Sequence, residues 1–141
     1  MAAWLTTGKD TSVVSHESAL DLLDLSDVIP DSIHILVPRD RRGLPPWSGI
    51  TLHTSTRPLL PNDVTTRNGL RLTAPMRTIL DVAEAGAAPE QVVQAVQQAV
   101  TKGLLMPTSL RQAARERGSR VDRLIAYSLE HLAAHSGEGR L

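Results

Sequence analysis

The 141-residue sequence contains no cysteine and only three aromatic residues, Trp4, Trp47 and Tyr127. Without cysteine the chain has no disulfides, thiolate nucleophiles, iron–sulfur clusters or cysteine-ligated zinc. With so few aromatic rings, a stacking platform for single-stranded nucleic acid is not expected. Apolar residues nevertheless make up 41% of the chain, so the sequence predicts a globular fold with an aliphatic core.

Long apolar segments are missing as well. No run approaches the roughly 18 residues that a membrane-spanning helix needs, and the first ten residues have neither a basic nor a long apolar part. A secretory signal contains both. We therefore expect no membrane association and a cytoplasmic location.

Familiar catalytic signatures are also absent, among them G-x-G-x-x-G, G-x-x-x-x-G-K-[ST], H-E-x-x-H and G-x-S-x-G. These patterns build nucleotide, metal and nucleophile sites. Their absence disfavours an enzyme of a familiar class, and we predict no catalytic residues, no cofactor and no metal.

The formal net charge is zero, but the charges are sorted along the chain. Residues 10–38 contain six acidic side chains and no Lys or Arg, residues 39–77 contain seven arginines against two acids, and residues 111–123 contain five arginines. Such sorting fits a basic surface for nucleic acid or an acidic partner. It also fits two parts of one fold that neutralise each other, which we favour.

The clearest local signals lie near the middle of the chain. Asn68 and Gly69 stand between two short strand-like runs and suit the two positive φ angles of a type I′ hairpin turn. Pro75 suits a first helical turn, and four apolar residues at helical spacing follow it. The pattern predicts a helix over 75–85 that is closed by Gly86.

Arg77 and Asp81 lie one turn apart on the polar face of this predicted helix. The order, with Arg first, is the less favourable one for a helical ion pair. We favour a solvated helix face or a tether to the preceding hairpin; the alternative is a contact used in recognition.

Further strands are predicted at 32–37 and 50–54, and further helices after Ser15, Pro89, Pro107 and Ser119. The fold class is therefore α+β, with a small, mostly antiparallel sheet in the first half and a helical second half packed against it. We expect an N-terminal stub over 1–11, a single domain over 12–134 and a flexible tail over 135–141.

His34 and His53 fall on the predicted strands, and both would lie on the same face if the strands pair. Two histidines invite a metal site, but a third ligand is not placed, so neutral imidazoles on a half-buried sheet face are favoured. His16 and Glu17 resemble a catalytic pair. Adjacent helical residues do not face each other, which disfavours that interpretation.

The loop Arg39-Asp40-Arg41-Arg42 is the best candidate for contact with phosphate or with an acidic partner. Guanidinium groups bind such anions bidentately. A solvated connection between two strands is the alternative.

Several motifs occur in a characteristic order. They are S-H-E-S-A-L at 15–20, I-H-I-L-V-P-R at 33–39, L-H-T at 52–54, R-P-L-L-P-N-D-V at 57–64, G-L-R-L-T-A-P-M-R-T-I-L-D at 69–81, P-E-Q-V at 89–92 and G-L-L at 103–105. In this order and spacing the sequence resembles the C-terminal domain of AbiEi-family antitoxins of bacterial type IV toxin–antitoxin systems, over roughly residues 12–110.

The resemblance implies an antitoxin that counters a nucleotidyltransferase-like toxin, by direct contact or indirectly. Such antitoxins often carry an N-terminal winged helix-turn-helix that represses their operon, and this sequence starts where that module would be ending. The matching positions are Ser15, His16, Ser18, His34, Pro38, Arg39, His53, Asp63, Gly69, Thr73, Pro75, Arg77, Thr78 and Asp81.

We therefore predict an interaction and regulatory domain of the antitoxin type. Its expected surface contacts with a partner or with nucleic acid are Arg39, Arg41, Arg42, His53, Arg77 and Asp81. One alternative is a transcriptional regulator that binds duplex DNA of its own operon. The other is an enzyme that modifies the toxin by phosphotransfer.

Overall fold

The structure is a computed structural model that describes residues 12–37, 49–54 and 57–139, with side chains up to residue 131. Contacts within the chain divide it into two compact units, one ending at Thr78 and the other beginning at Ile79. The boundary lies inside a helix, α3 (Pro75–Ala85). Each unit contains its own set of buried apolar residues.

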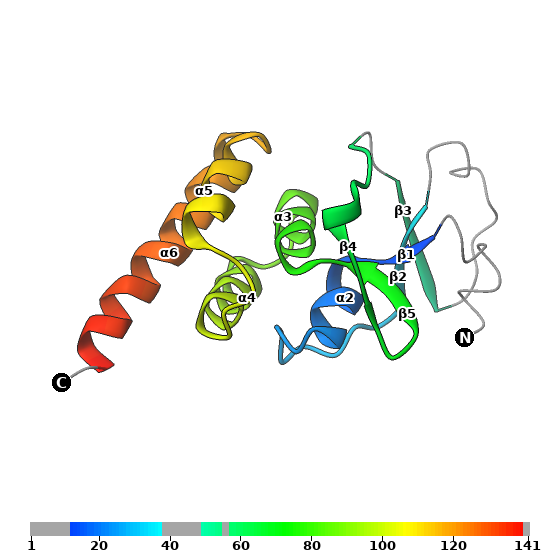
Figure 1. Cartoon of the computed structure of the whole chain (residues 1–141), viewed down its shortest axis with the longest axis horizontal. Helices are drawn as coiled ribbons and strands as arrows, with labels where there is room; N and C mark the ends of the chain where they lie inside the picture. Colours follow the sequence, from blue (N-terminus) through cyan, green and yellow to red (C-terminus); the bar gives the residue numbers. More distant parts are fainter. Residues whose placement is uncertain (1–11, 38–48, 55–56, 140–141) are drawn as a thin grey trace. The chain divides into compact units, whose positions relative to one another are not determined.

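In the part of the first unit that the structure describes, a five-stranded sheet is accompanied by one helix of its own and by the first turn of α3 (Figure 1). The strands are β1 (Val13–Val14), β2 (Ile33–Val37), β3 (Ile50–Thr54), β4 (Val64–Arg67) and β5 (Leu70–Thr73), in the order β3-β2-β1-β5-β4. The helix α2 (His16–Leu22) follows β1 directly, and a short 3₁₀ turn, η2 (Pro61–Asp63), precedes β4. The two-residue strand β1 thus occupies the centre of the sheet.

The predicted α+β class, with the sheet in the first half and helices in the second, is confirmed. The prediction that the sheet is mostly antiparallel is wrong. Strands β1–β2 and β4–β5 pair antiparallel, but β2–β3 and β1–β5 pair parallel. The connection between β2 and β3 runs over residues 38–49, which is long enough for a parallel crossover.

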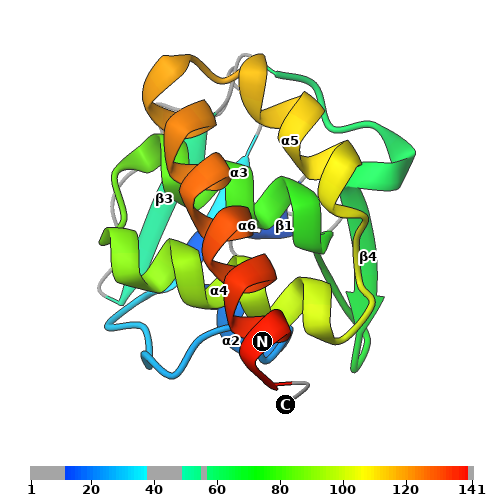
Figure 2. The same ribbon diagram turned by 90° about the vertical axis from the view of Figure 1, so that its left-hand side faces the viewer.

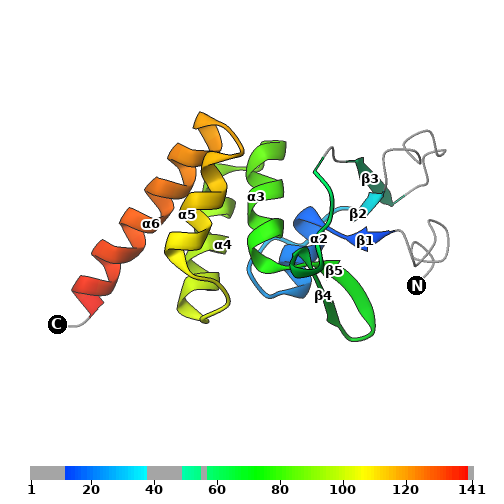
Figure 3. The same cartoon turned by 45° about the horizontal axis from the view of Figure 1, so that its top comes forward.

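The hairpin β4–β5 forms as predicted and is visible in Figure 3. Asn68 and Gly69 adopt φ angles of 53° and 78°, the positive pair that a type I′ turn requires. At the other end of the hairpin, the backbone N–H of Ala74 donates to the carbonyl of Asp63 at 2.8 Å. This hydrogen bond holds the residue before α3 against the start of the hairpin.

Successive side chains of strand β2 lie on opposite faces of the sheet. Ile35 and Val37 are buried on one face and pack with Ile50 and Leu52 of β3. His34 points to the opposite face, because successive strand residues alternate. Among the described residues of the first unit, the buried apolar ones are Val13, Val14, Ala19, Leu20, Leu23, Leu25, Ile35, Leu36, Val37 and Leu72.

The predicted helix over 75–85 is confirmed as α3, and Gly86 ends it with a φ of 93°. The N–H groups of Gly86 and Ala87 donate to the carbonyls of Ala83 and Val82, which is the Schellman arrangement. The helix thus ends where its predicted glycine cap stands.

The second unit is helical (Figure 2). It continues from α3 with α4 (Pro89–Thr101), α5 (Pro107–Arg115) and α6 (Ser119–Gly139), each beginning at its predicted residue. Its core is aliphatic, as expected from the shortage of aromatic residues, and includes Ile79, Val82, Val92, Val96, Leu110, Val121 and Ile125. None of the helices in the described part of the chain is long and apolar enough to cross a membrane.

Candidate interaction site

Three of the six predicted contact residues, Arg39, Arg41 and Arg42, lie outside the residues that the structure describes. Their role in partner or phosphate binding stays a prediction. The other three, His53, Arg77 and Asp81, lie in well-described elements, and each belongs to a polar network.

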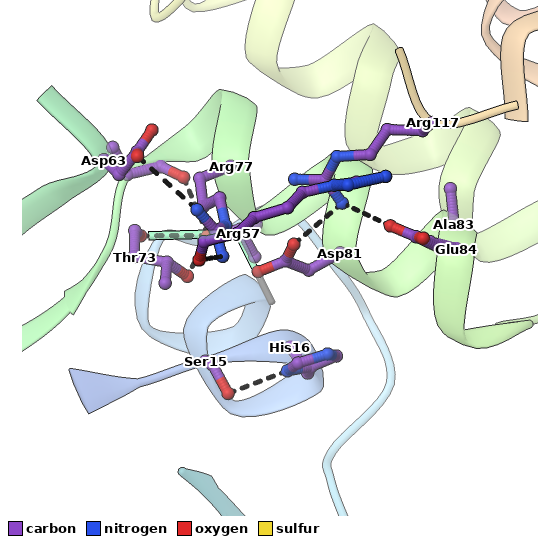
Figure 4. A network of polar contacts seen from close by, with 12 residues as sticks. Ser15, His16, Arg57, Asp63, Thr73, Arg77, Asp81, Ala83, Glu84 and Arg117 are labelled. Atoms are coloured by element: carbon purple, nitrogen blue, oxygen red, sulfur yellow. Dashed lines mark hydrogen bonds and ion pairs between the residues drawn. The ribbon is translucent and has the colours of Figure 1, made fainter. Parts of the chain in front are cut away.

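Arg77 anchors the segment that leads into the hairpin (Figure 4). Its guanidinium donates to the backbone carbonyls of Pro58 at 3.2 Å and Arg57 at 3.3 Å, and to the Asp63 carboxylate at 3.4 Å. Only 4% of the Arg77 side chain is exposed. One buried cation thus donates to two backbone carbonyls of an irregular segment.

Asp63 organises the same region from the other side. Its carboxylate accepts the backbone N–H of Leu60 at 2.8 Å as well as the Arg77 contact. The Asp63 carbonyl also accepts the backbone N–H of Ala74. These contacts together join the segment that leads into the hairpin, the hairpin itself and the start of α3. Arg77 thus ties α3 to the hairpin region that precedes it. This is one of the two interpretations favoured for Arg77 from the sequence.

Thr73 and Thr78 complete the junction between β5 and α3. The Thr78 hydroxyl lies 2.8 Å from the Ala74 carbonyl, 2.9 Å from the Thr73 carbonyl and 2.6 Å from the Thr73 hydroxyl. Both threonines are fully buried. The two threonines of the T-A-P-M-R-T motif therefore have a structural role, which is to stabilise the turn between β5 and α3.

Asp81 belongs to a second network, within the helical unit (Figure 4). The Arg117 guanidinium donates to Asp81 at 2.9 Å and to Glu84 at 2.8 Å. The exposed fractions of the Arg117 and Asp81 side chains are 6% and 8%, whereas Glu84 is 45% exposed. Two carboxylates thus neutralise Arg117, which lies two residues beyond the end of α5 and 36 residues from Asp81 along the chain.

Two further arginines of the 111–123 segment, Arg111 and Arg120, also make contacts within this unit. Arg120 donates to the carbonyls of Ala83 and Glu84, both at 2.9 Å, near the C-terminus of α3, where cations are favoured. Arg111 pairs with Asp122 at 3.0 Å. These contacts join arginines of the 111–123 segment to groups of the same unit. Neutralisation between the acidic residues of 10–38 and the arginine-rich segments stays a prediction.

The prediction that Arg77 and Asp81 lie on the surface is thus wrong, since both side chains are buried. The sequence pattern placed them correctly on the polar face of α3. Both side chains are nevertheless buried, because Arg77 and Asp81 contact residues that are distant in the sequence. Helical spacing does not reveal such contacts. Whether either residue contributes to partner binding stays a prediction.

His53 lies in a cluster of three imidazoles from three elements: His16 of α2, His34 of β2 and His53 of β3. The rings of His16 and His53 stack with centroids 3.6 Å apart, and those of His34 and His53 with centroids 5.1 Å apart. The expectation that His34 and His53 share a sheet face and come within reach is confirmed by the 2.8 Å distance between Nδ1 of His34 and Nε2 of His53.

Hydrogen bonds connect the cluster to Glu17 and Ser15. Nε2 of His34 lies 3.2 Å from the Glu17 carboxylate, and Nδ1 of His16 lies 2.7 Å from the Ser15 hydroxyl. These contacts are satisfied when His34 donates from Nε2 to Glu17 and accepts at Nδ1 from Nε2–H of His53. In this arrangement, one ring nitrogen of His34 and one of His53 are occupied by the hydrogen bond between the two rings. Among the described residues, no group of three or more side chains that could hold a metal ion was found.

The backbone at His16 is unusual. Its φ angle is 52°, a left-handed conformation that costs a non-glycine residue roughly 1–2 kcal/mol. Ser15 stands at the N-cap position of α2 but makes no side-chain cap bond; its hydroxyl instead meets His16. The contacts of the cluster thus hold a strained helix start.

We expect His34→Phe to lower the free energy of unfolding by about 1–2 kcal/mol, because the ring volume is kept while the contacts to His53 and Glu17 are lost. Urea unfolding followed by circular dichroism measures the change. His131→Phe is the matched control, since His131 is exposed on α6, and should change stability by less than about 0.5 kcal/mol. Equal effects of the two substitutions would contradict a structural role for the cluster.

Sequence reasoning missed Arg117 and the pairing of Glu17 with His34. Arg117 was only one member of an arginine-rich segment, and nothing local marks it as buried. Glu17 was considered with its neighbour His16 rather than with a strand residue. Both pairings arise from tertiary contacts.

Comparison with known proteins adds a decisive observation. The family model described as the AbiEi antitoxin C-terminal domain matches residues 12–131. The chain belongs to the AbiEi antitoxin C-terminal domain family. The family resemblance seen in the sequence is thereby confirmed, and the match to the AbiEi domain extends from β1 into α6.

A solved structure supports the fold of this AbiEi domain. The RV2827C protein from Mycobacterium tuberculosis matches with a TM-score of 0.67 at 17% sequence identity, over 93% of this chain. The chain spans about half, 52%, of the length of that structure. No match was found among curated proteins.

Proposed function

We propose that the chain acts as an antitoxin that neutralises a nucleotidyltransferase-like toxin in a bacterial toxin–antitoxin system. The observation that carries this proposal is the match to the antitoxin domain, which runs through both units of the chain. The proposed mode of action is direct binding in the cytoplasm.

Growth rescue tests the proposal. The product of the adjacent gene is expressed alone and together with this chain in the same bacterial host. We expect the adjacent product to stop growth and co-expression to restore it. The chain carrying Arg77→Met, which loses the buried anchor of the first unit, is expected to rescue growth less well than the unchanged chain.

Continued growth arrest in the presence of the folded chain would contradict the antitoxin proposal. Rescue without a detectable complex would favour indirect neutralisation or enzymatic modification of the toxin over direct binding.

A further inference from the structure

A groove runs between α4 and α6 in the helical unit, where Figure 2 shows α6 crossing α4. Its volume is about 500 Å³. One wall is formed by Leu124 and Tyr127 of α6. The other wall is a stripe of α4 at helical spacing, made of Pro89, Glu90, Val93, Gln94 and Gln97.

Tyr127 gives this groove an exposed aromatic wall. It is 50% exposed, although the chain has only three aromatic residues. Its ring lies against that of His131, with centroids 3.8 Å apart, and Nδ1 of His131 lies 3.0 Å from the Tyr127 carbonyl. A tyrosine that is held in this way beside an apolar groove is typical of the residues that anchor protein interfaces.

Two opposite charges flank Tyr127 on the same stripe of α6. Arg123 precedes Tyr127 by four residues, Glu130 follows it by three, and both are exposed. Seven residues of helix separate the two charges by about 10 Å, which is too far for them to pair with each other. Within the described part of the chain, no ion pair involves either side chain.

The balance of charge narrows the class of partner. Glu90 lines the groove, and Arg120 lies on the α6 stripe seven residues before Tyr127. Together with Arg123 and Glu130, these described charges of the face add up to zero. Such a face has no excess of positive charge to attract the phosphates of nucleic acids or of anionic membranes.

The arrangement of the charges is complementary to itself. The midpoint between Arg123 and Glu130 falls between residues 126 and 127, and residues 122–131 around it are all described. A two-fold axis at this point makes two α6 helices antiparallel and places each Arg123 opposite Glu130 of the other copy. The two Tyr127 rings then meet at the centre. Parallel pairing would instead place like charges opposite each other.

We propose that the chain forms a symmetric homodimer through this groove, with the two α6 helices antiparallel. Tyr127 of each copy packs between α4 and α6 of the other copy, against Val93 and Leu124. The two pairs of Arg123 and Glu130 lie at the rim, so that the interface has an apolar centre and a charged border. The inference does not rest on the proposed antitoxin function. Because the apolar centre is small, we expect a Kd of about 10–100 µM.

Sedimentation equilibrium tests the dimer over chain concentrations from about 5 to about 500 µM, which bracket the expected Kd. The variants are Tyr127→Ala, the single reversals Arg123→Glu and Glu130→Arg, and the double variant that carries both reversals. Met106→Ser is the control for Tyr127→Ala, because Met106 is 65% exposed and does not line the groove. Arg115→Glu is the control for the reversals, because Arg115 is exposed on α5. Circular dichroism first establishes that each variant is folded.

We expect Tyr127→Ala to weaken dimer formation at least tenfold at low and high salt. Each single reversal should weaken it about tenfold at low salt and less at high salt, because it makes both rim contacts repulsive and salt screens them. The double variant should dimerise within about threefold of the unchanged chain, and so should an equal mixture of the two single variants, because opposite charges then meet again. Both controls should stay within about twofold.

An unchanged chain that sediments as a single chain at every concentration would overturn the inference. A dimer that withstands Tyr127→Ala and both single reversals would also overturn it, since its interface would lie elsewhere. Failure of the double variant and of the mixture to restore the dimer would rule out the antiparallel pairing. If Tyr127→Ala weakens binding to the product of the adjacent gene or to duplex DNA while the unchanged chain stays monomeric, the groove belongs to that partner instead. Growth rescue, which tests the antitoxin proposal, is measured separately and can succeed or fail independently of the dimer.

Discussion

Replacing Arg77 by methionine is expected to lower the free energy of unfolding of the first unit by about 2–4 kcal/mol. Methionine keeps an aliphatic stem but removes the contacts to the carbonyls of Arg57 and Pro58 and to the Asp63 carboxylate. Hydrogen bonds to a charged donor contribute about 1.5–3 kcal/mol each, and these contacts are long, which places each near the lower end.

Urea unfolding followed by circular dichroism measures this loss. Arg67→Met is the matched control, because Arg67 is exposed and donates to one carbonyl, that of Leu22; it should cost less than about 1 kcal/mol. Arg77→Lys should lose most of the same stability, since an ammonium group cannot reproduce the fork of the guanidinium. An effect of Arg77→Met no larger than that of Arg67→Met would argue against the buried anchor.

The second large effect is expected at Asp81. Asp81→Ala should cost about 3 kcal/mol, because Arg117 is 6% exposed and would retain only the exposed carboxylate of Glu84 among its two acidic partners. Removal of one member of a buried ion pair leaves an uncompensated charge, which is costlier than removal of both members. The double variant Asp81→Ala with Arg117→Met should therefore be more stable than Asp81→Ala alone.

A double-mutant cycle on Asp81 and Arg117 measures their coupling, which we expect to be about 1–3 kcal/mol. Glu84→Ala serves as the control, because the Glu84 side chain is 45% exposed, and it should cost less than about 1 kcal/mol. Additive single effects at Asp81 and Arg117 would show that the pair is not coupled in solution.

Local signals predicted much of the fold. The Asn68-Gly69 turn, the proline at the start of α3 and the glycine after its end determine a hairpin and a helix through backbone conformation alone. The helices that begin at Pro89, Pro107 and Ser119 follow from similar signals. Alternation along β2 likewise placed His34 on the face it occupies.

Long-range pairing could not be predicted in the same way. Strand β1 has only two residues, too few for a periodic pattern, and it forms because β2 and β5 bind its two edges. The parallel pairing of β2 with β3 is not determined by the alternation within either strand. A sequence that alternates correctly is compatible with both directions.

The candidate site shows the same division. Helical spacing placed Arg77 and Asp81 on one polar face, but their burial depends on Arg57, Asp63 and Arg117, which lie up to 36 residues away. Arg123, Tyr127 and Glu130 stand at helical spacing in the sequence. The groove that Tyr127 borders became apparent only in the structure.

Direct neutralisation is the central claim, and complex formation tests it most directly. This chain and the product of the adjacent gene are produced together, purified through a tag on one of them, and analysed by size-exclusion chromatography with light scattering. We predict that the two proteins elute together as a stoichiometric complex that withstands dilution to micromolar concentration. Separate elution of two folded proteins, in a strain whose growth is rescued, would contradict direct binding.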